Sequence, residues 1–196
     1  MPITNTLKKA YALFDEANAK DPNTEKIKGD LVPKELIYGQ RMTQTLEKYE
    51  PKASEALKLA ARAQHICRWE IPRNSYPMDR VGYLKWREEL KKFHAQKASQ
   101  ILQGIHYDSE VIDRVTFLLQ KKKLKKDEET QVLEDVICLV FLDFYYESFL
   151  EKHTEEKVVD ILQKTWRKMS ENGHQAALKL SFSEKALALI QSALNG

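Results

Sequence analysis

The chain has 196 residues, 42% of them hydrophobic and 31% charged, which suffices for one domain with a sizeable core. A formal net charge of +3 is too small to indicate a nucleic-acid-binding protein by itself. The longest uninterrupted apolar run, residues 136–142, is far too short to span a membrane. The N-terminus shows no apolar leader, and the two cysteines lie in hydrophobic surroundings. We therefore expect a cytoplasmic protein with no membrane partner.

Apolar residues recur at three- and four-residue spacing along most of the chain, which is typical of amphipathic helices. This spacing predicts helices over residues 6–20, from Pro33 onward, and over 51–69, 79–102, 109–122, 128–150, 155–170 and 183–194. Residues 18–29 are predicted to form a polar turn and residues 71–79 an ordered loop, and Gly173 to break the chain. No segment alternates with period two between hairpin turns. The sequence therefore predicts a single all-α domain over residues 1–196, around a central apolar helix at 128–150.

Arginine is concentrated in one part of the chain, whereas elsewhere the positive charge is nearly all lysine. Five of the eight arginines and two of the three tryptophans lie within residues 62–87. The planar guanidinium binds phosphate or carboxylate through two hydrogen bonds at once, which lysine cannot do. We predict an anion-binding stretch with arginine ligands and aromatic stacking surfaces: Arg62, Arg68, Arg73, Arg80 and Arg87 with Trp69, Tyr76 and Trp86. The alternative is that these arginines pair internally with acidic residues.

Three acids, Glu134, Asp135 and Asp143, interrupt the most apolar stretch of the chain at 131–146, and two histidines stand in other predicted helices. Asp135 is flanked at helical spacing by apolar residues, and Glu134 precedes it. A buried carboxylate is costly unless it is paired or binds a metal. The pattern therefore favours either a buried ion pair with an arginine or a ligand or catalytic group. His65 and His94 are the histidines placed to join such a site.

Long motifs in this chain resemble a family known as domain of unknown function 4202. They are DPN (21–23), YGQRM (38–42), ARAQHICRWEIPR (61–73), YPMDRVGYLKWR (76–87), LEDVICLVFL (133–142) and KTWRKMS (164–170). Some members carry the label glutamyl-tRNA synthetase, and residues 65–68 and 168–170 look like fragments of class I synthetase signatures. The chain lacks the alternation of strands and helices that a nucleotide-binding sheet requires, so we do not expect aminoacylation.

The same segments are more distantly similar to the HD phosphohydrolase superfamily, which is all-helical and binds divalent metal through histidines and aspartates. By position, the resemblance implies an HD-like helix bundle with His65, His94 and Asp135 as metal ligands. Two positions depart from that pattern. Tyr38 stands where the superfamily has its first histidine, and Ile66 stands where it has the aspartate of the histidine–aspartate doublet.

Two functions are therefore expected. The first is a metal-dependent phosphohydrolase acting on a phosphorylated or nucleotide-like substrate. Mn, Mg, Fe or Zn would be bound by His65, His94 and Asp135, with Glu134 and Asp135 as catalytic residues. The alternative is a non-catalytic module of HD-like fold that binds a small anion, RNA or a protein. In a third reading, the arginines, aromatic residues and carboxylates form a purely structural network. Nucleic acid is the less favoured partner, and the oligomeric state stays open.

Overall fold

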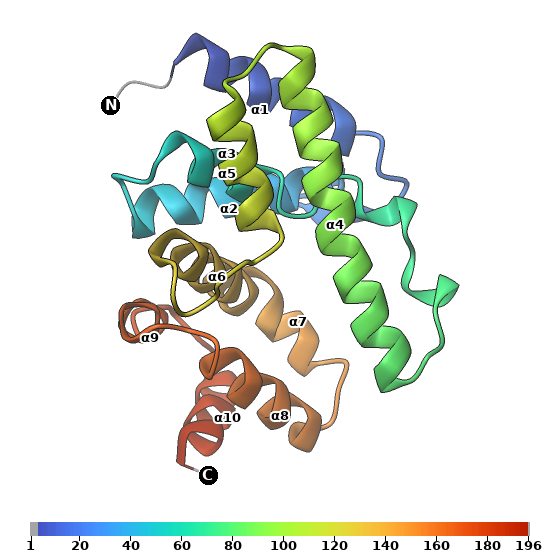
Figure 1. The fold of residues 1–196 in the computed structure, drawn as a ribbon. Helices are drawn as coiled ribbons and strands as arrows, with labels where there is room; N and C mark the ends of the chain where they lie inside the picture. The colour runs from blue at the N-terminus through green and yellow to red at the C-terminus, as the bar shows by residue number, and fades with distance from the viewer. Residues whose placement is uncertain (1–3, 196) are drawn as a thin grey trace. The chain divides into compact units, whose positions relative to one another are not determined.

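The computed structural model describes residues 4–195 and confirms an all-α fold (Figure 1). These residues form ten α-helices and one two-stranded antiparallel sheet. The elements of the first part are α1 (Asn5–Asn18), β1 (Thr24–Ile27), β2 (Asp30–Pro33), α2 (Lys34–Tyr49), α3 (Glu55–Arg62), α4 (Arg80–Gly104) and α5 (Ser109–Leu119). Those of the second part are α6 (Glu128–Val140), α7 (Tyr146–Leu150), α8 (Glu155–Trp166), α9 (Glu171–Ala177) and α10 (Glu184–Asn195). None of the helices within residues 4–195 could serve as a membrane span.

The chain divides into two compact units, Met1–Lys123 and Leu124–Gly196. Residues 1–3 and 196 lie outside the described residues. Because two compact units can belong to one domain or to two, the expectation of a single domain over 1–196 stays a prediction. The arrangement of the bundle around residues 128–150 also stays a prediction, since those residues belong to the second unit alone.

A short hairpin occupies part of the region that the sequence predicted to be a polar turn. Strand β1 pairs with β2 in antiparallel register, Thr24 opposite Pro33 and Ile27 opposite Asp30. The two turn residues, Lys28 and Gly29, have φ values of 50° and 105°. Positive φ at both turn positions matches the right-handed twist of a hairpin, and glycine adopts it without steric cost. The predicted turn is therefore wrong in part, because the pair Lys-Gly was not recognised as a hairpin signal.

Helix α3 is shorter than the predicted helix 51–69 at both ends. It begins after Ser54, whose hydroxyl accepts a hydrogen bond from the Leu57 N–H at 3.1 Å, so Pro51 lies outside it. It ends at Arg62, and Cys67 takes a left-handed conformation with φ 53°. The N–H of Cys67 donates to Asn18 Oδ1 at 2.9 Å and so is not used to continue a helix. His65 therefore lies in the turn after the helix and not on it.

Two short 3₁₀ turns precede α4: η1 (Arg68–Glu70) comes just before the predicted ordered loop, and η2 (Arg73–Ser75) lies within it. Helix α4 begins as predicted after Asp79, whose carboxylate accepts from the Gly82 N–H at 2.7 Å. A Cβ atom at Gly82 would lie 2.1 Å from the Pro77 carbonyl oxygen. Only glycine therefore allows the loop to turn so closely into the helix.

In the second unit, the predicted helix 128–150 is continuous but changes type. Helix α6 passes into a π-helical segment, η3 (Phe141–Tyr145), and then into α7. The prediction that Gly173 breaks the chain is wrong, because Gly173 lies inside α9. Its N–H donates to the hydroxyl of Ser170, which caps the helix, at 3.1 Å. A Cβ atom at Gly173 would lie 2.8 Å from the carboxyl carbon of Asp135, so this glycine makes room for a buried acid.

We expect Gly173→Ala to destabilise the protein by about 1–3 kcal/mol, because the added methyl group overlaps a carboxylate that its hydrogen bonds hold in place. Gly104→Ala is the matched control, since a Cβ at Gly104 meets no atom within 4 Å. That change should leave stability unaltered or raise it by up to about 1 kcal/mol. Urea unfolding followed by circular dichroism measures both. Equal effects of the two substitutions would contradict the close packing of Gly173.

Candidate functional site

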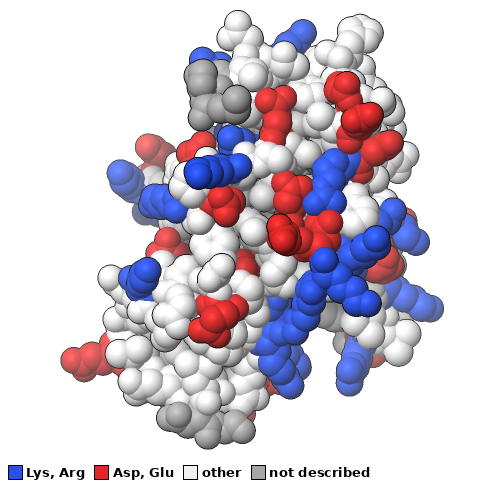
Figure 2. Space-filling model, turned by 60° about the vertical axis from the view of Figure 1, so that its left-hand side comes forward, with Lys and Arg blue, Asp and Glu red and all other residues white. Residues whose placement is uncertain are grey.

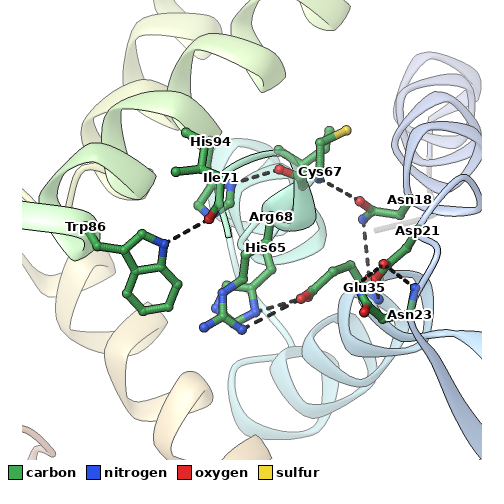
Figure 3. Close-up of polar contacts among 11 residues, drawn as sticks. Asn18, Asp21, Asn23, Glu35, His65, Cys67, Arg68, Ile71, Trp86 and His94 are labelled. Atoms are coloured by element: carbon green, nitrogen blue, oxygen red, sulfur yellow. Dashed lines mark hydrogen bonds and ion pairs between the residues drawn. The ribbon is translucent and has the colours of Figure 1, made fainter. Parts of the chain in front are cut away.

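Two polar side chains position the start of α2, where a buried glutamate projects into the first unit. The Asp21 carboxylate accepts hydrogen bonds from the backbone N–H groups of Asn23, at 2.9 Å, and Glu35, at 3.0 Å. The Asn18 side chain donates to the Glu35 carbonyl at 3.3 Å and accepts from the Cys67 N–H at 2.9 Å. The motif DPN and the end of α1 therefore place Glu35 next to the turn that carries His65 (Figure 3).

The Glu35 carboxyl group faces one imidazole and one guanidinium (Figure 3). Its Oε2 lies 3.2 Å from His65 Nδ1, and its Oε1 lies 3.7 Å from Arg68 Nη1. The Glu35 side chain is 7% exposed, against 24% for His65 and 32% for Arg68. Tyr38 stacks on the His65 ring with a centroid separation of 4.0 Å and an interplanar angle of 12°. Carboxylate and tyrosine together determine how the imidazole is oriented.

His94 extends the group from α4. Its Nδ1 lies 2.8 Å from the Ile66 carbonyl oxygen, so this nitrogen carries the proton and donates. The residue is only 4% exposed, and its buried Nε2 has no hydrogen-bond partner. The His65 and His94 ring centroids are 5.9 Å apart. We call Glu35, His65, Arg68 and His94 the histidine cluster.

Burial and nearby cations keep both imidazoles neutral. Burial lowers the pKa of His94 to about 3, and the neighbouring His65 adds to that effect. Burial also holds the pKa of His65 well below its usual value. The charges of Arg68, Arg87, Lys121 and Lys34 lower that pKa further. Burial raises the pKa of Glu35, and Arg68 opposes that shift. A neutral imidazole with its proton on Nδ1 has a lone pair on Nε2, which can accept a proton or bind a metal.

Two of the predicted anion-binding arginines, Arg62 and Arg73, form hydrogen bonds within the protein. Arg62 donates to both carboxylate oxygens of Asp15, at 2.8 and 2.5 Å, and to the Thr43 hydroxyl at 3.2 Å. Arg73 donates to three backbone carbonyls of its own loop, those of Tyr76, Pro77 and Asp79. Their predicted role in anion binding is not tested by these contacts, but their donors already have partners.

The other members of the arginine-rich stretch lie in different environments. The Arg68 guanidinium lies 5.2 Å from the Trp86 ring centroid, and the buried Trp86 indole donates to the Ile71 carbonyl at 2.9 Å. Arg87 donates to the Tyr83 hydroxyl at 3.1 Å. Arg80 is exposed, and Trp69 and Tyr76 are half-buried. Trp86 thus provides a surface for an arginine, and the predicted stacking of a ligand on these rings stays a prediction.

The acids predicted as catalytic or metal-binding groups lie in the second unit, where Asp135 has several donors of its own. Asp135 accepts from the Ser170 N–H at 2.8 Å, the Ser170 hydroxyl at 2.5 Å and the Gln131 amide at 3.0 Å. Glu134 is buried, with an oxygen 4.0 Å from the Lys168 amine. The hydrogen bonds between Asp135 and Ser170 connect α6 to the start of α9 and so stabilise the second unit. A catalytic role for either acid stays a prediction.

The structure brings together His65 and His94, as the sequence predicted, within the first unit. Asp135 belongs to the second unit, so its proposed convergence with the histidines stays a prediction. Among residues 4–195, no group of three or more histidine, cysteine or acidic side chains is arranged to hold a metal ion. Two imidazoles alone leave the ligand set of a tightly bound divalent metal incomplete.

Glu35 is the member of the cluster that the sequence analysis did not identify. The buried residues of α2 include Glu35, Tyr38, Met42 and Leu46, which recur at helical spacing. Reading the helix from this periodicity places the glutamate on the buried face. The sequence indicates Asp135 as a buried acid because apolar residues flank it at helical spacing, whereas the residues around Glu35 are less apolar.

Fold and site together define an all-helical protein with a buried carboxylate–imidazole pair beside an arginine. The chain belongs to the family described as Domain of unknown function (DUF4202), whose model matches residues 8–190. This match confirms the family resemblance, while the HD-like resemblance stays a prediction. No curated protein and no solved structure matches the chain.

We expect acid to destabilise the fold because His94 is neutral when buried. A pKa of about 3 in the folded state, against an ordinary 6.5, means that the unfolded state binds more protons between these values. Stability is therefore complete above about pH 6.5 and falls as the pH decreases, by about 1–2 kcal/mol at pH 5. Urea unfolding at pH 7 and pH 5 measures the loss.

His94→Gln should lose less stability than the wild type between these two pH values, because the amide does not titrate. His106→Asn is the control, since His106 is exposed. This control should keep the wild-type pH dependence. An unchanged pH dependence in His94→Gln would contradict the assignment.

We expect Arg73→Lys to lower stability by about 1–2 kcal/mol, because an ammonium cannot hold all three loop carbonyls in the same geometry. The same substitution at the exposed Arg80 should change stability by less than about 0.5 kcal/mol. Thermal melting of both variants decides the point. If Arg73→Lys melts like the wild type, the guanidinium does not hold the loop.

Proposed function

We propose that the chain binds the anionic group of a phosphorylated small molecule at the histidine cluster. The observation that carries the proposal is the positive surrounding of a neutral histidine. The charges that lower the pKa of His65 most are four cations, Arg68, Arg87, Lys121 and Lys34. The Glu35 carboxylate opposes these charges at 3.2 Å from the imidazole. An anion placed beside His65 would compensate this excess of positive charge.

The geometry of Arg68 supports the same proposal. One guanidinium nitrogen faces Glu35 at 3.7 Å, which is longer than a hydrogen bond, and one face of the group lies over Trp86. The side chain is one-third exposed, so its donors are accessible to a ligand. A guanidinium held flat by an aromatic ring is suited to bind phosphate oxygens through two parallel hydrogen bonds. His65 Nε2 would then exchange a proton with the bound group.

A local anion site also agrees better with the charge distribution than a nucleic acid surface does. On the face shown in Figure 2, Asp and Glu side chains lie among the Lys and Arg side chains. Lys and Arg side chains gather in one part of that face beside acidic side chains and do not cover the rest of it, whereas a nucleic acid backbone needs a basic surface over several phosphates. We therefore propose a small ligand with one phosphoryl or similar group.

A second candidate function is the metal-dependent phosphohydrolase of HD-like type. One observation favours it: His94 Nε2 is buried without a partner while Nδ1 donates to a carbonyl. Metal-binding histidines show this arrangement, in which an outer acceptor orients the ring. His65 has a similar arrangement, because its Nδ1 lies 3.2 Å from the Glu35 carboxyl oxygen Oε2. The residues present fit a metal only in part, since the described chain offers no third ligand beside them and the nearby cations disfavour a dication.

Calorimetry with inorganic phosphate, pyrophosphate, a sugar phosphate and a nucleoside triphosphate tests the proposed function. We expect at least one of them to bind, and Arg68→Lys to weaken that binding by about 10- to 100-fold, because the charge stays but the second hydrogen bond is lost. His65→Gln should weaken it less. Arg80→Lys is the matched control and should bind like the wild type.

The absence of binding to the whole panel, or equal binding by Arg68→Lys and the wild type, would contradict the anion site. Metal analysis of protein purified without chelator separates the second candidate. One equivalent of metal that disappears in His94→Gln, together with metal-dependent phosphate release, would favour the hydrolase over simple binding.

A further inference from the structure

The His65 ring has one nitrogen directed at Glu35 and one directed away from it. Nδ1 lies 3.2 Å from Glu35 Oε2, and Arg68 Nη1 lies 3.7 Å from the other carboxyl oxygen. The charge of Arg68 opposes the effect of burial on the Glu35 pKa, and Lys34 adds to that opposition. A carboxylate only accepts hydrogen bonds, so the imidazole donates to it from Nδ1. Nε2 is therefore the nitrogen with a lone pair.

The surroundings of His65 disfavour a second proton on the ring. Burial holds its pKa well below the usual value, and the charges of Arg68, Arg87, Lys121 and Lys34 lower it further. Arginine and lysine side chains have donors only, whereas the neutral imidazole offers an acceptor at Nε2. An anion that approaches this group therefore meets many donors and one acceptor.

Glu35 brings this acceptor and the donors of Arg68 to one place. His65 and Arg68 face the two oxygens of the same carboxyl group, and both come from the segment that follows α3 (Figure 3). The His65 side chain is 24% exposed and the Arg68 side chain 32%, so both are open to a ligand. A ligand that satisfies both must accept hydrogen bonds from the guanidinium and donate one to the imidazole.

We propose that Glu35, by holding the His65 proton on Nδ1, makes the site select an anion that carries its own hydroxyl group. The class is inorganic phosphate or a terminal phosphoryl group in its singly protonated form. This inference rests on the proposed function and names the ligand class of the same site. Arg68 binds the phosphoryl oxygens, and the P–OH group donates to His65 Nε2. Glu35 does not touch the ligand and acts through the imidazole as a positioning residue.

Sulfate and phosphate differ by this criterion although both are tetrahedral anions. At neutral pH inorganic phosphate keeps at least one hydroxyl group, whereas sulfate keeps none. Sulfate would place an oxygen against the lone pair of His65 Nε2 and leave that nitrogen without a donor. A phosphate monoester, whose second pKa is about 6, can enter with one proton, and a sulfate ester cannot. A site built around a ligand hydroxyl rejects analogues that lack it.

Calorimetry at pH 7 and constant ionic strength compares phosphate with sulfate, and glucose 6-phosphate with glucose 6-sulfate. We expect the phosphoryl compound of each pair to bind at least about tenfold more tightly. Sulfate compounds that bind as tightly, with both members weakened by Arg68→Lys, would overturn the selection and leave the anion site standing. If none of the four anions binds, the anion site and this inference both fail.

Substitution at Glu35 tests the role of its carboxyl group. Glu35→Gln keeps the shape of the side chain, but an amide can donate to Nδ1 as well as accept from it, so the His65 proton is no longer held on one nitrogen. The ratio of phosphate to sulfate affinity should fall about tenfold, toward one. Glu47→Gln, at an exposed position of α2, is the matched control and should keep the wild-type ratio. An unchanged ratio in a folded Glu35→Gln variant would contradict the role of Glu35.

Nitrogen-15 NMR of the imidazoles gives a reading that does not depend on ligand binding. In the wild-type protein at pH 7, His65 should show a protonated Nδ1 and an unprotonated Nε2. A proton on Nε2, or on both nitrogens, would overturn the proposal even if Glu35→Gln failed to fold.

Discussion

The buried carboxyl group of Glu35 is the constraint on which the first unit depends. Removing a carboxylate from water is costly, and the fold offsets this cost with His65 on one oxygen and Arg68 near the other. The backbone of the same residue is bound by Asp21 and Asn18, and Asn18 also binds the turn at Cys67. The end of α1, the start of α2 and the turn after α3 therefore meet at one residue. Because the Cys67 N–H is bound by Asn18, α3 does not continue beyond Arg62, and His65 faces the Glu35 carboxyl group.

The arginine-rich stretch holds the fold together through several of its members, while its role in anion binding stays a proposal. Arg73 and the Trp86 indole hold the loop through backbone carbonyls, and Arg62 holds Asp15. Arg68 remains one-third exposed beside the histidine cluster. The structural members thus maintain the surface on which Arg68 is placed, because the loop that Arg73 holds also carries the carbonyl that orients Trp86. Arg62 pairs with the Asp15 carboxylate and Arg68 faces that of Glu35, whereas Arg73 binds backbone carbonyls.

Apolar periodicity predicted most helices, since it is a local property. Thr154, Asp79 and Asp108 cap their helices through equally local hydrogen bonds. Apart from the Lys28-Gly29 turn and the start of α3, which are local, the failures involve partners distant in sequence. The end of α3 depends on Asn18, 49 positions from Cys67. Gly173 stays helical because Asp135 needs the space that a side chain would fill. The periodicity of α2 places Glu35 on the buried face, but the partners that compensate its carboxylate, His65 and Arg68, lie far along the chain.

The two units treat buried acids in different ways, and the difference shows where chemistry is to be expected. Asp135 accepts hydrogen bonds from one backbone N–H, one hydroxyl and one amide, all of them neutral donors that keep their protons. Glu35 instead faces an imidazole, which can gain or lose a proton, and burial raises its own pKa. In the proposed function, the proton would move between Glu35, His65 and the bound anion, and no buried group would be left unpaired. Substitution at Asp135 should therefore act on stability, whereas substitution at Glu35 should also alter the protonation of His65.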